Sequence, residues 1–420
     1  MRAFGLNMKT IHSLSSRRLL SHWLGGPLRR GPFLLQPHDW TRLTEEACQS
    51  GLPGVVLEKA NQEGIDVPQS DATRLQSHAL QIAASNLHIS GEMEPILAAL
   101  EEAVIPVMLL KGFALRLDIY PRPDLRPMGD VDVLIQSRDL LRAFEVLNRL
   151  GCQGGTDLAG DNLFPQFHNE VEFFTPGVRP IRIDLHVRPF RSLRVSQLMP
   201  DSALWEHAER RNLGRLTVLI PSPTLMFLHL AAHAAFHGFS RLVWLYDIVR
   251  LIDLQGDRID WALVIRRAKE WGLVLPVREA IARIHDQFGE LFPPHIQGEL
   301  RRYLTTWFDR ISLVQTPHDA SSPIQHVLTN LLCVSGWRFR LKYLAALLRP
   351  GSRHLGDVYS NRHLGWSACA QSWRMLRGAL RFLAMLAAPF RRFSTYVGRA
   401  EAFCPKDRRS LIPWKGMANR

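Results

Sequence analysis

Two aspartates separated by one residue carry the strongest chemical signal in the sequence. Asp130 and Asp132 begin the run 130–135, whose other residues are aliphatic. Side chains alternate between the two faces of a β-strand, so both carboxylates should project from the same face. Carboxylate oxygens are good ligands for Mg²⁺, which in proteins usually also holds substrate phosphates. The pair therefore predicts a magnesium site for phosphate chemistry, with a solvated strand edge as the alternative.

A third carboxylate lies on a second predicted strand. Arg182, Asp184 and His186 share one face of this strand, and aliphatic residues fill the other face. If the strand lies beside the first one, Asp184 joins Asp130 and Asp132. Three converging carboxylates are the arrangement that two-metal nucleotidyl transfer requires. The reserve candidates for the third carboxylate are Glu170 and Glu172.

A glycine directly after a buried strand offers a place for phosphate. The wholly apolar run 104–110 predicts that strand, Lys111 and Gly112 interrupt it, and 113–120 is predicted to be a helix. Glycine lets a phosphate approach the backbone closely, and the first turn of a helix presents unpaired N–H groups. Arg126, in the loop before the metal strand, is either a second phosphate ligand or a surface arginine.

Together these blocks resemble the uncharacterised bacterial nucleotidyltransferase family, within the DNA polymerase beta-like nucleotidyltransferase superfamily. The resemblance rests on the residues Leu-Leu-Lys111-Gly112, the run 126–135, Asp184-Leu-His186, His233-x-x-x-His237 and the run 242–248. It covers roughly residues 40–300, and the C-terminal tail lies outside it.

The resemblance implies both a fold and an activity. Asp130 and Asp132 would hold Mg²⁺, and Asp184 would complete the triad and help to activate the attacking hydroxyl. The reaction would transfer an NMP from an NTP to a hydroxyl-type acceptor and release pyrophosphate. The acceptor would be a small molecule, a sugar or a peptide.

One position departs from the superfamily pattern. Phe113 follows the turn glycine where a serine is usual, so we expect the Lys111 ammonium to supply the missing phosphate contact as a point charge. The same departure leaves a second hypothesis open, a non-catalytic nucleotide-binding regulatory module of the same fold. The predicted nucleotide-binding residues are Lys111, Gly112, Arg126 and Gly129.

Three histidines follow one helical face. His229, His233 and His237 are four residues apart, so they should form a stripe. Core packing is the first interpretation, and lining of the nucleotide site by His233, His237 and the strand residue His186 is the second. Zinc binding is the third, although no glutamate follows the histidines as it does in HExxH helices. Asp247 is a candidate for orienting one of the rings.

The elements predict a mainly helical α+β protein with a small mixed β-sheet core, flanked by N- and C-terminal helical segments. Residues 40–100 are predicted to form helices, including 70–90 and another that begins near Gly91. A Pro-Gly break at 176–177 predicts a hairpin, and 215–220 predicts a further strand. The expected divisions are a basic arm 1–38, a helical segment 39–100, a nucleotidyltransferase core 101–222, a helical domain 223–310, a linker 311–323 and a basic helical extension 324–420.

The positive charge is concentrated in the tail. Residues 321–420 contain 17 basic and 3 acidic residues. Their net charge of +14 exceeds the net charge of +13 of the whole chain. The stretch 373–390 predicts a basic amphipathic helix, which suits an anionic membrane surface. A scaffold at a membrane surface is therefore another hypothesis, and nucleic acid is disfavoured because the arginines share their helix with too much aliphatic surface. Five cysteines without a CxxC pair predict that the protein lies in a reducing cytoplasm. The basic tail adds the prediction of peripheral contact at the inner membrane face.

Overall fold

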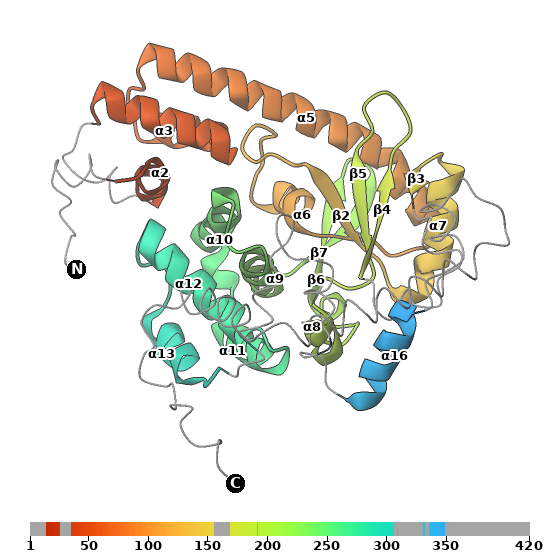
Figure 1. The fold of residues 1–420 in the computed structure, drawn as a ribbon. Coiled ribbons are helices and arrows are strands. Elements are labelled where there is room, and N and C mark those ends of the chain that lie inside the picture. Colours follow the sequence, from red (N-terminus) through yellow and green to blue (C-terminus); the bar gives the residue numbers. More distant parts are fainter. Residues whose placement is uncertain are drawn as a thin grey trace, which may run out of the picture.

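The computed structural model describes residues 14–25, 35–154, 169–190, 192–305, 309, 331 and 336–348. Within them, a mixed sheet is surrounded by helices (Figure 1), which confirms the predicted α+β class. The strands are β1 Met108–Leu109, β2 Asp130–Leu134, β3 Gln153–Gly154, β4 Glu170–Phe174, β5 Arg182–His186, β6 Ala208–Leu213 and β7 Leu216–Pro221. Their order across the sheet is β3-β4-β5-β2-β1-β7-β6.

The strands that carry the acidic residues lie side by side. β2 and β5 are parallel, and the register places Asp132 opposite Asp184. Val131 and Ile183 are buried on the other face, so period two directs the aliphatic side chains into the core and the acids away from it. The structure therefore confirms that the two predicted strands are adjacent in the sheet.

Two hairpins complete the sheet. β4 and β5 are antiparallel, as the Pro-Gly break at 176–177 predicts. β7 matches the predicted strand 215–220, and it pairs with β6 through a turn in which Gly214 has a φ of 59°. The sequence analysis does not predict β6, because its residues Ala-Glu-Arg-Arg-Asn-Leu lack β-branched and aromatic side chains.

Helices form most of the remaining structure. They are α2 Ser16–Gly25, α3 Pro37–Ser50, α4 Pro53–Gln62, α5 Gln69–Glu102, α6 Lys111–Asp118, α7 Leu140–Arg149, α8 Leu193–Leu198, α9 Pro223–Phe236, α10 Leu242–Gln255, α11 Trp261–Glu270, α12 Val274–Phe288, α13 Pro294–Arg302 and α16 Trp337–Leu348. α9 contacts α10, α11 and α12, and nearly all of its side chains are buried. One continuous hydrophobic core joins the helices to the sheet.

The long helix α5 differs from the sequence-based expectation of a break near Gly91. It continues through Gly91 and Pro95 and contacts α3 and α4 as well as α7 and β7 (Figure 1). Its buried residues follow one face on both sides of Gly91, from Leu75 to Leu100. Tertiary packing of this face therefore maintains the helix through Gly91 and Pro95, which are weak helix formers.

The predicted segments at the two chain ends are described only in part. Residues 16–25, inside the range predicted as a basic arm, form the half-buried helix α2, which contacts α3 and α12. The predicted linker 311–323 and the stretch 373–390 lie outside the described residues. Of the predicted extension 324–420, the structure describes residue 331 and the segment 336–348, which contains α16. Among the described helices, none has the length and apolar character that spanning a membrane would need.

Candidate active site

Asp132, Asp184 and His186 form a buried cluster at the centre of the sheet. One ligand atom from each residue lies within 4.8 Å of the other two. Their exposed fractions are 3%, 5% and 2%. Because β2 and β5 are parallel and in register, the two carboxylates are neighbours, and His186 follows Asp184 on the same face of β5.

The structure brings together only part of the predicted carboxylate triad in this cluster. Asp130 begins β2 opposite Arg182, and its carboxylate forms an ion pair with the Arg182 guanidinium. Its side chain is 35% exposed, and its oxygens are not among the close group of ligand atoms found in the described residues. His186, which the sequence predicts only as a site-lining residue, is instead part of the cluster.

Asp132 is held in its ionised form by two partners. Lys111 Nζ lies 2.5 Å and His186 Nε2 lies 2.8 Å from the same oxygen, Asp132 Oδ1. Burial alone raises the pKa of Asp132, but the Lys111 charge and the hydrogen bond from His186 outweigh it and hold the pKa well below its usual range. Asp132 therefore stays negative throughout the physiological pH range.

Asp184 has the opposite electrostatic environment. Burial, followed by the charge of Asp132, raises the pKa of Asp184 to about 6, and Arg182 offsets this only in part. Asp184 Oδ1 lies 3.3 Å from Arg182 Nε, yet it is buried and accepts no hydrogen bond from the described residues. A carboxylate whose pKa lies near neutrality can accept a proton, and one beside a second carboxylate can also bind a cation.

Lys111 reaches the cluster from an unusual backbone conformation. It is the first residue of α6, and its φ of 44° is in the left-handed region that residues other than glycine rarely adopt. The turn is fixed to β2, because Leu110 N donates to Asp132 O over 3.0 Å. Strain of this kind is commonly found at functional sites, so the conformation supports a role for the Lys111 side chain beyond that of a solvated turn.

Gly112 leaves space for a buried arginine. A Cβ at Gly112 would lie 2.1 Å from Arg126 Nη1. Arg126 donates to both oxygens of Asp247 over 3.3 and 3.0 Å, and Tyr120 Oη donates to Asp247 Oδ1 over 2.9 Å. Arg126 is therefore a buried residue that connects the loop 121–129 to α10, and Asp247 binds Arg126 and Tyr120 instead of orienting a histidine ring. Gly129, the remaining predicted nucleotide-binding residue, is exposed.

The histidine stripe leads away from the cluster along α9. The ring centroids of His233 and His237 are 4.4 Å apart, and both rings contact Trp244. His229 is fully buried, and neither of its ring nitrogens has a hydrogen-bond partner among the described residues. Burial, and then the Lys111 charge, lower the pKa of His229 to about 3, so the ring is neutral. None of the three belongs to a metal-competent group within the described residues.

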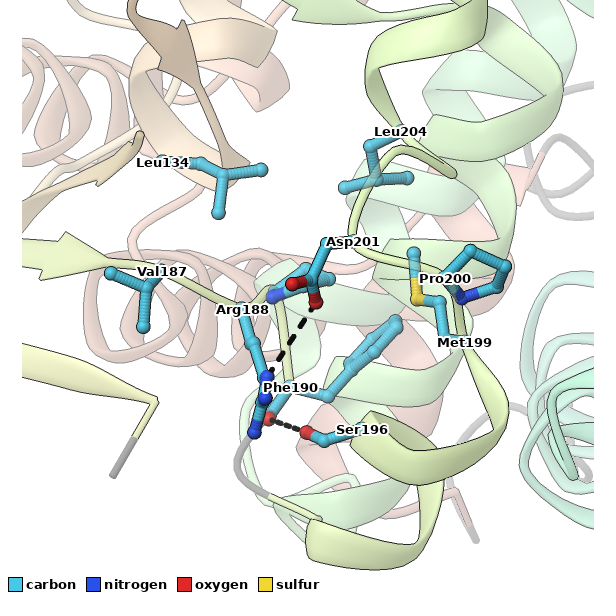
Figure 2. Close-up of a pocket in the computed structure, with 10 residues that line it drawn as sticks. Leu134, Val187, Arg188, Phe190, Ser196, Met199, Pro200, Asp201 and Leu204 are labelled. Carbon is cyan, nitrogen blue, oxygen red and sulfur yellow. Dashed lines mark hydrogen bonds and ion pairs between the residues drawn. The ribbon is translucent and has the colours of Figure 1, made fainter. Parts of the chain in front are cut away.

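Two hollows lie near these residues. The first, shown in Figure 2, is lined by Leu134, Phe190 and Ser196 and has a volume of about 10 Å³. That volume holds roughly one water molecule, so it does not admit a nucleotide. The second is a cleft of about 650 Å³ between α3, α5 and the segment 240–243, within the usual size range of ligand pockets. Its lining includes Met128, whose Cγ would lie 3.2 Å from a Cβ at Gly112, but the described residues that line the cleft include neither Lys111 nor any member of the cluster.

Comparison with known proteins places the chain in a family. The model of a family described as an uncharacterised nucleotidyltransferase matches residues 36–289, so the chain belongs to that family. Among solved structures, the chain is similar to an antigenic nucleotidyltransferase-like protein from Paracoccidioides brasiliensis, at 16% identity and a TM-score of 0.32, over 53% of this chain and 96% of the other. No curated protein sequence is significantly similar to the chain.

Proposed function

We propose that the protein is a metal-dependent nucleotidyltransferase that transfers an NMP from an NTP to a hydroxyl-type acceptor. The observation that carries the proposal is the pair Asp132 and Asp184, adjacent on parallel strands, with the Lys111 ammonium beside them. Membership of the nucleotidyltransferase family supports the same reaction class.

The donor set fits a divalent cation. Two buried carboxylates face one another, and a buried oxygen of Asp184 accepts no hydrogen bond from the described residues. We propose Asp130, Asp132 and Asp184 as the carboxylate ligands, with Asp130 moving from Arg182 to the cation. Mg²⁺, when bound, would neutralise charge on the phosphates and polarise the phosphorus that is attacked.

The residues of the chain would position and activate the reactants. Asp184 would accept the proton of the acceptor hydroxyl, because burial and the neighbouring Asp132 charge make it the more basic of the two carboxylates. The acceptor oxygen would then form a bond to the α-phosphorus, and the bond from this phosphorus to the bridging oxygen would break. Pyrophosphate would leave with that electron pair.

The other predicted residues would bind the nucleotide. The Lys111 ammonium, now on Asp132, would turn to the triphosphate once a cation shares the Asp132 charge. Gly129, which is exposed, would allow close backbone approach. Arg126, which is paired with Asp247 and fills the space beside Gly112, would support the nucleotide-binding turn from behind. His186, His233 and His237 would line the site, and the acceptor would be a small molecule, a sugar or a peptide.

Incubation of the protein with α-³²P-labelled NTPs, Mg²⁺ and candidate acceptors tests the proposal. Label should pass to an acceptor with the wild-type chain and not with Asp132→Asn. Asp66→Asn is the matched control, because Asp66 is an exposed aspartate in the connection between α4 and α5. Transfer by Asp132→Asn at the wild-type rate would refute the assigned role of the cluster.

A non-catalytic nucleotide-binding module is the second candidate. The observation that favours it is Phe113, whose side chain is fully buried and offers no donor to a triphosphate where the superfamily has serine. This candidate predicts NTP binding by equilibrium dialysis without pyrophosphate release under any acceptor and metal condition.

We also propose that the protein acts in the cytoplasm, with the basic extension 324–420 in contact with an anionic membrane surface. The charge of residues 321–420 supports this contact, because each basic residue near such a surface contributes about 1 kcal/mol.

A further inference from the structure

We propose that His186 is itself a ligand of the catalytic cation, that Glu170 orients its ring, and that the site therefore selects Mn²⁺ over Mg²⁺. The inference rests on the proposed function, in which this cluster binds a divalent cation. It adds a nitrogen ligand and an orienting carboxylate to the set of aspartates.

The first observation is the position of the imidazole. His186 Nε2 points at Asp132 Oδ1 over 2.8 Å, and it belongs with Asp132 and Asp184 to the group of atoms within 4.8 Å of one another. The ring is almost fully buried. Asp130 is more exposed and engaged with Arg182, so His186 is closer to the centre of the cluster than the first aspartate of the Asp-x-Asp pair.

The second observation is the carboxylate behind the ring. Glu170 on β4 is the register partner of His186 on β5, and Glu170 Oε2 lies 3.4 Å from His186 Nδ1, which makes no hydrogen bond among the described residues. Without a metal, the contact of the ring is Nε2 to Asp132 Oδ1. A cation at Nε2 would replace that contact, and the proton on Nδ1 would then face the Glu170 carboxylate. Histidine ligands in metal sites commonly have a carboxylate in this position.

The third observation is the excess of negative charge. Strands β2, β4 and β5 carry five carboxylates around this point, and among the described residues Lys111, Arg182 and the His186 ring contact them, including Asp132 and Asp184 at the centre. These carboxylates are Asp130, Asp132, Glu170, Glu172 and Asp184. The buried oxygen Asp184 Oδ1 accepts no hydrogen bond from the described residues. A divalent cation would supply the missing positive charge.

The nitrogen ligand determines whether the site prefers Mn²⁺ or Mg²⁺. Mg²⁺ prefers oxygen ligands and an octahedral shell that keeps several waters. Mn²⁺ accepts carboxylates as Mg²⁺ does but, as a first-row transition metal, binds imidazole nitrogen more readily than Mg²⁺, although later metals of the series bind it more tightly still. Carboxylates together with a histidine therefore favour Mn²⁺ over Mg²⁺, and an all-oxygen version of the same site should lose most of that preference.

Direct measurement of Mn²⁺ binding tests the inference without nucleotide or turnover. The full-length protein is stripped with EDTA, titrated with Mn²⁺ while free Mn²⁺ is followed by EPR, and then challenged with Mg²⁺. We expect His186→Asp to lower the Mn²⁺ affinity by at least about tenfold without lowering the Mg²⁺ affinity. Glu170→Gln should lower the Mn²⁺ affinity by about tenfold, which is within the usual range for a residue that orients a metal ligand. His295→Asn, on the exposed face of α13, is the matched control and should change neither affinity.

A spectroscopic signature keeps the inference testable if a variant fails to fold. Electron spin-echo modulation of Mn²⁺ bound to the wild-type protein should show coupling to one ¹⁴N nucleus, and this coupling should disappear in His186→Asp. Absence of ¹⁴N coupling, or an unchanged ratio of Mn²⁺ to Mg²⁺ affinity in His186→Asp, would overturn the inference. If Mn²⁺ binds through nitrogen but no NMP transfer occurs, the proposed function fails while the metal assignment stands.

Discussion

Replacing Asp184 by asparagine should stabilise the metal-free protein while removing its proposed activity. Burial and the Asp132 charge raise the pKa of Asp184 to about 6, compared with 3.8 for an ordinary aspartate. The folded state thus binds more protons than the unfolded state between these two values, so the stability of the wild type falls as the pH rises through this window and is constant above it. At about 1.36 kcal/mol per unit, ionised Asp184 destabilises the fold by roughly 3 kcal/mol near neutral pH.

Asparagine has the shape of the protonated side chain and carries no charge. In EDTA at about pH 7.5, Asp184→Asn should therefore exceed the wild type in unfolding free energy by about 3 kcal/mol, and at about pH 5 by roughly half of that. Urea unfolding followed by circular dichroism at both pH values measures the difference. The control Asp66→Asn changes an exposed aspartate in the connection between α4 and α5 and should shift stability by less than about 0.5 kcal/mol. A variant no more stable than the wild type at pH 7.5, or a difference independent of pH, would refute the electrostatic reasoning.

Three further predictions concern the turn and the tail. Lys111→Ala should raise the NTP concentration needed for half-maximal turnover more than the metal concentration, which steady-state kinetics separates; unchanged NTP dependence would make Lys111 a simple turn residue. Gly112→Ala should destabilise the fold by about 1–3 kcal/mol, because its Cβ would collide with the Arg126 guanidinium; an unchanged midpoint of thermal unfolding contradicts this packing. Truncation before Ser321 should reduce co-sedimentation with anionic vesicles and leave binding to neutral vesicles unchanged; if the full-length chain ignores anionic vesicles at low salt, the tail has no such role.

Local patterns in the sequence predict the strands that matter most. The alternation of acids and aliphatic residues in 130–135 and 181–187 predicts two half-buried strands, and burial of their apolar faces then fixes which way Asp132 and Asp184 point. The family resemblance adds the adjacency of the two strands. The register confirms it.

Contacts between distant residues are not visible in such patterns. The ion pair of Lys111 with Asp132 and that of Arg126 with Asp247 join residues 21 and 121 positions apart. Lys111 and Arg126 have the same residue types whether they bind a phosphate or a carboxylate of the protein, so only the packed fold separates these interpretations. The same limit applies to His186, which lies opposite Leu134 in the register yet contacts Asp132.

Helix α2 shows that the folding unit extends beyond the region that defines the family. It precedes the matched residues 36–289 and lies between α3 and α12 (Figure 1). Trp23 packs edge-on against Trp40 of α3, and His22 Nδ1 lies 2.7 Å from Gln287 O of α12. A gene fragment that starts at the family boundary would expose the part of α12 that α2 covers and would be prone to aggregate. Dissection of this protein into expressible pieces should therefore begin ahead of residue 16, and grafting of the sheet alone into another scaffold would lose the helices that close around it.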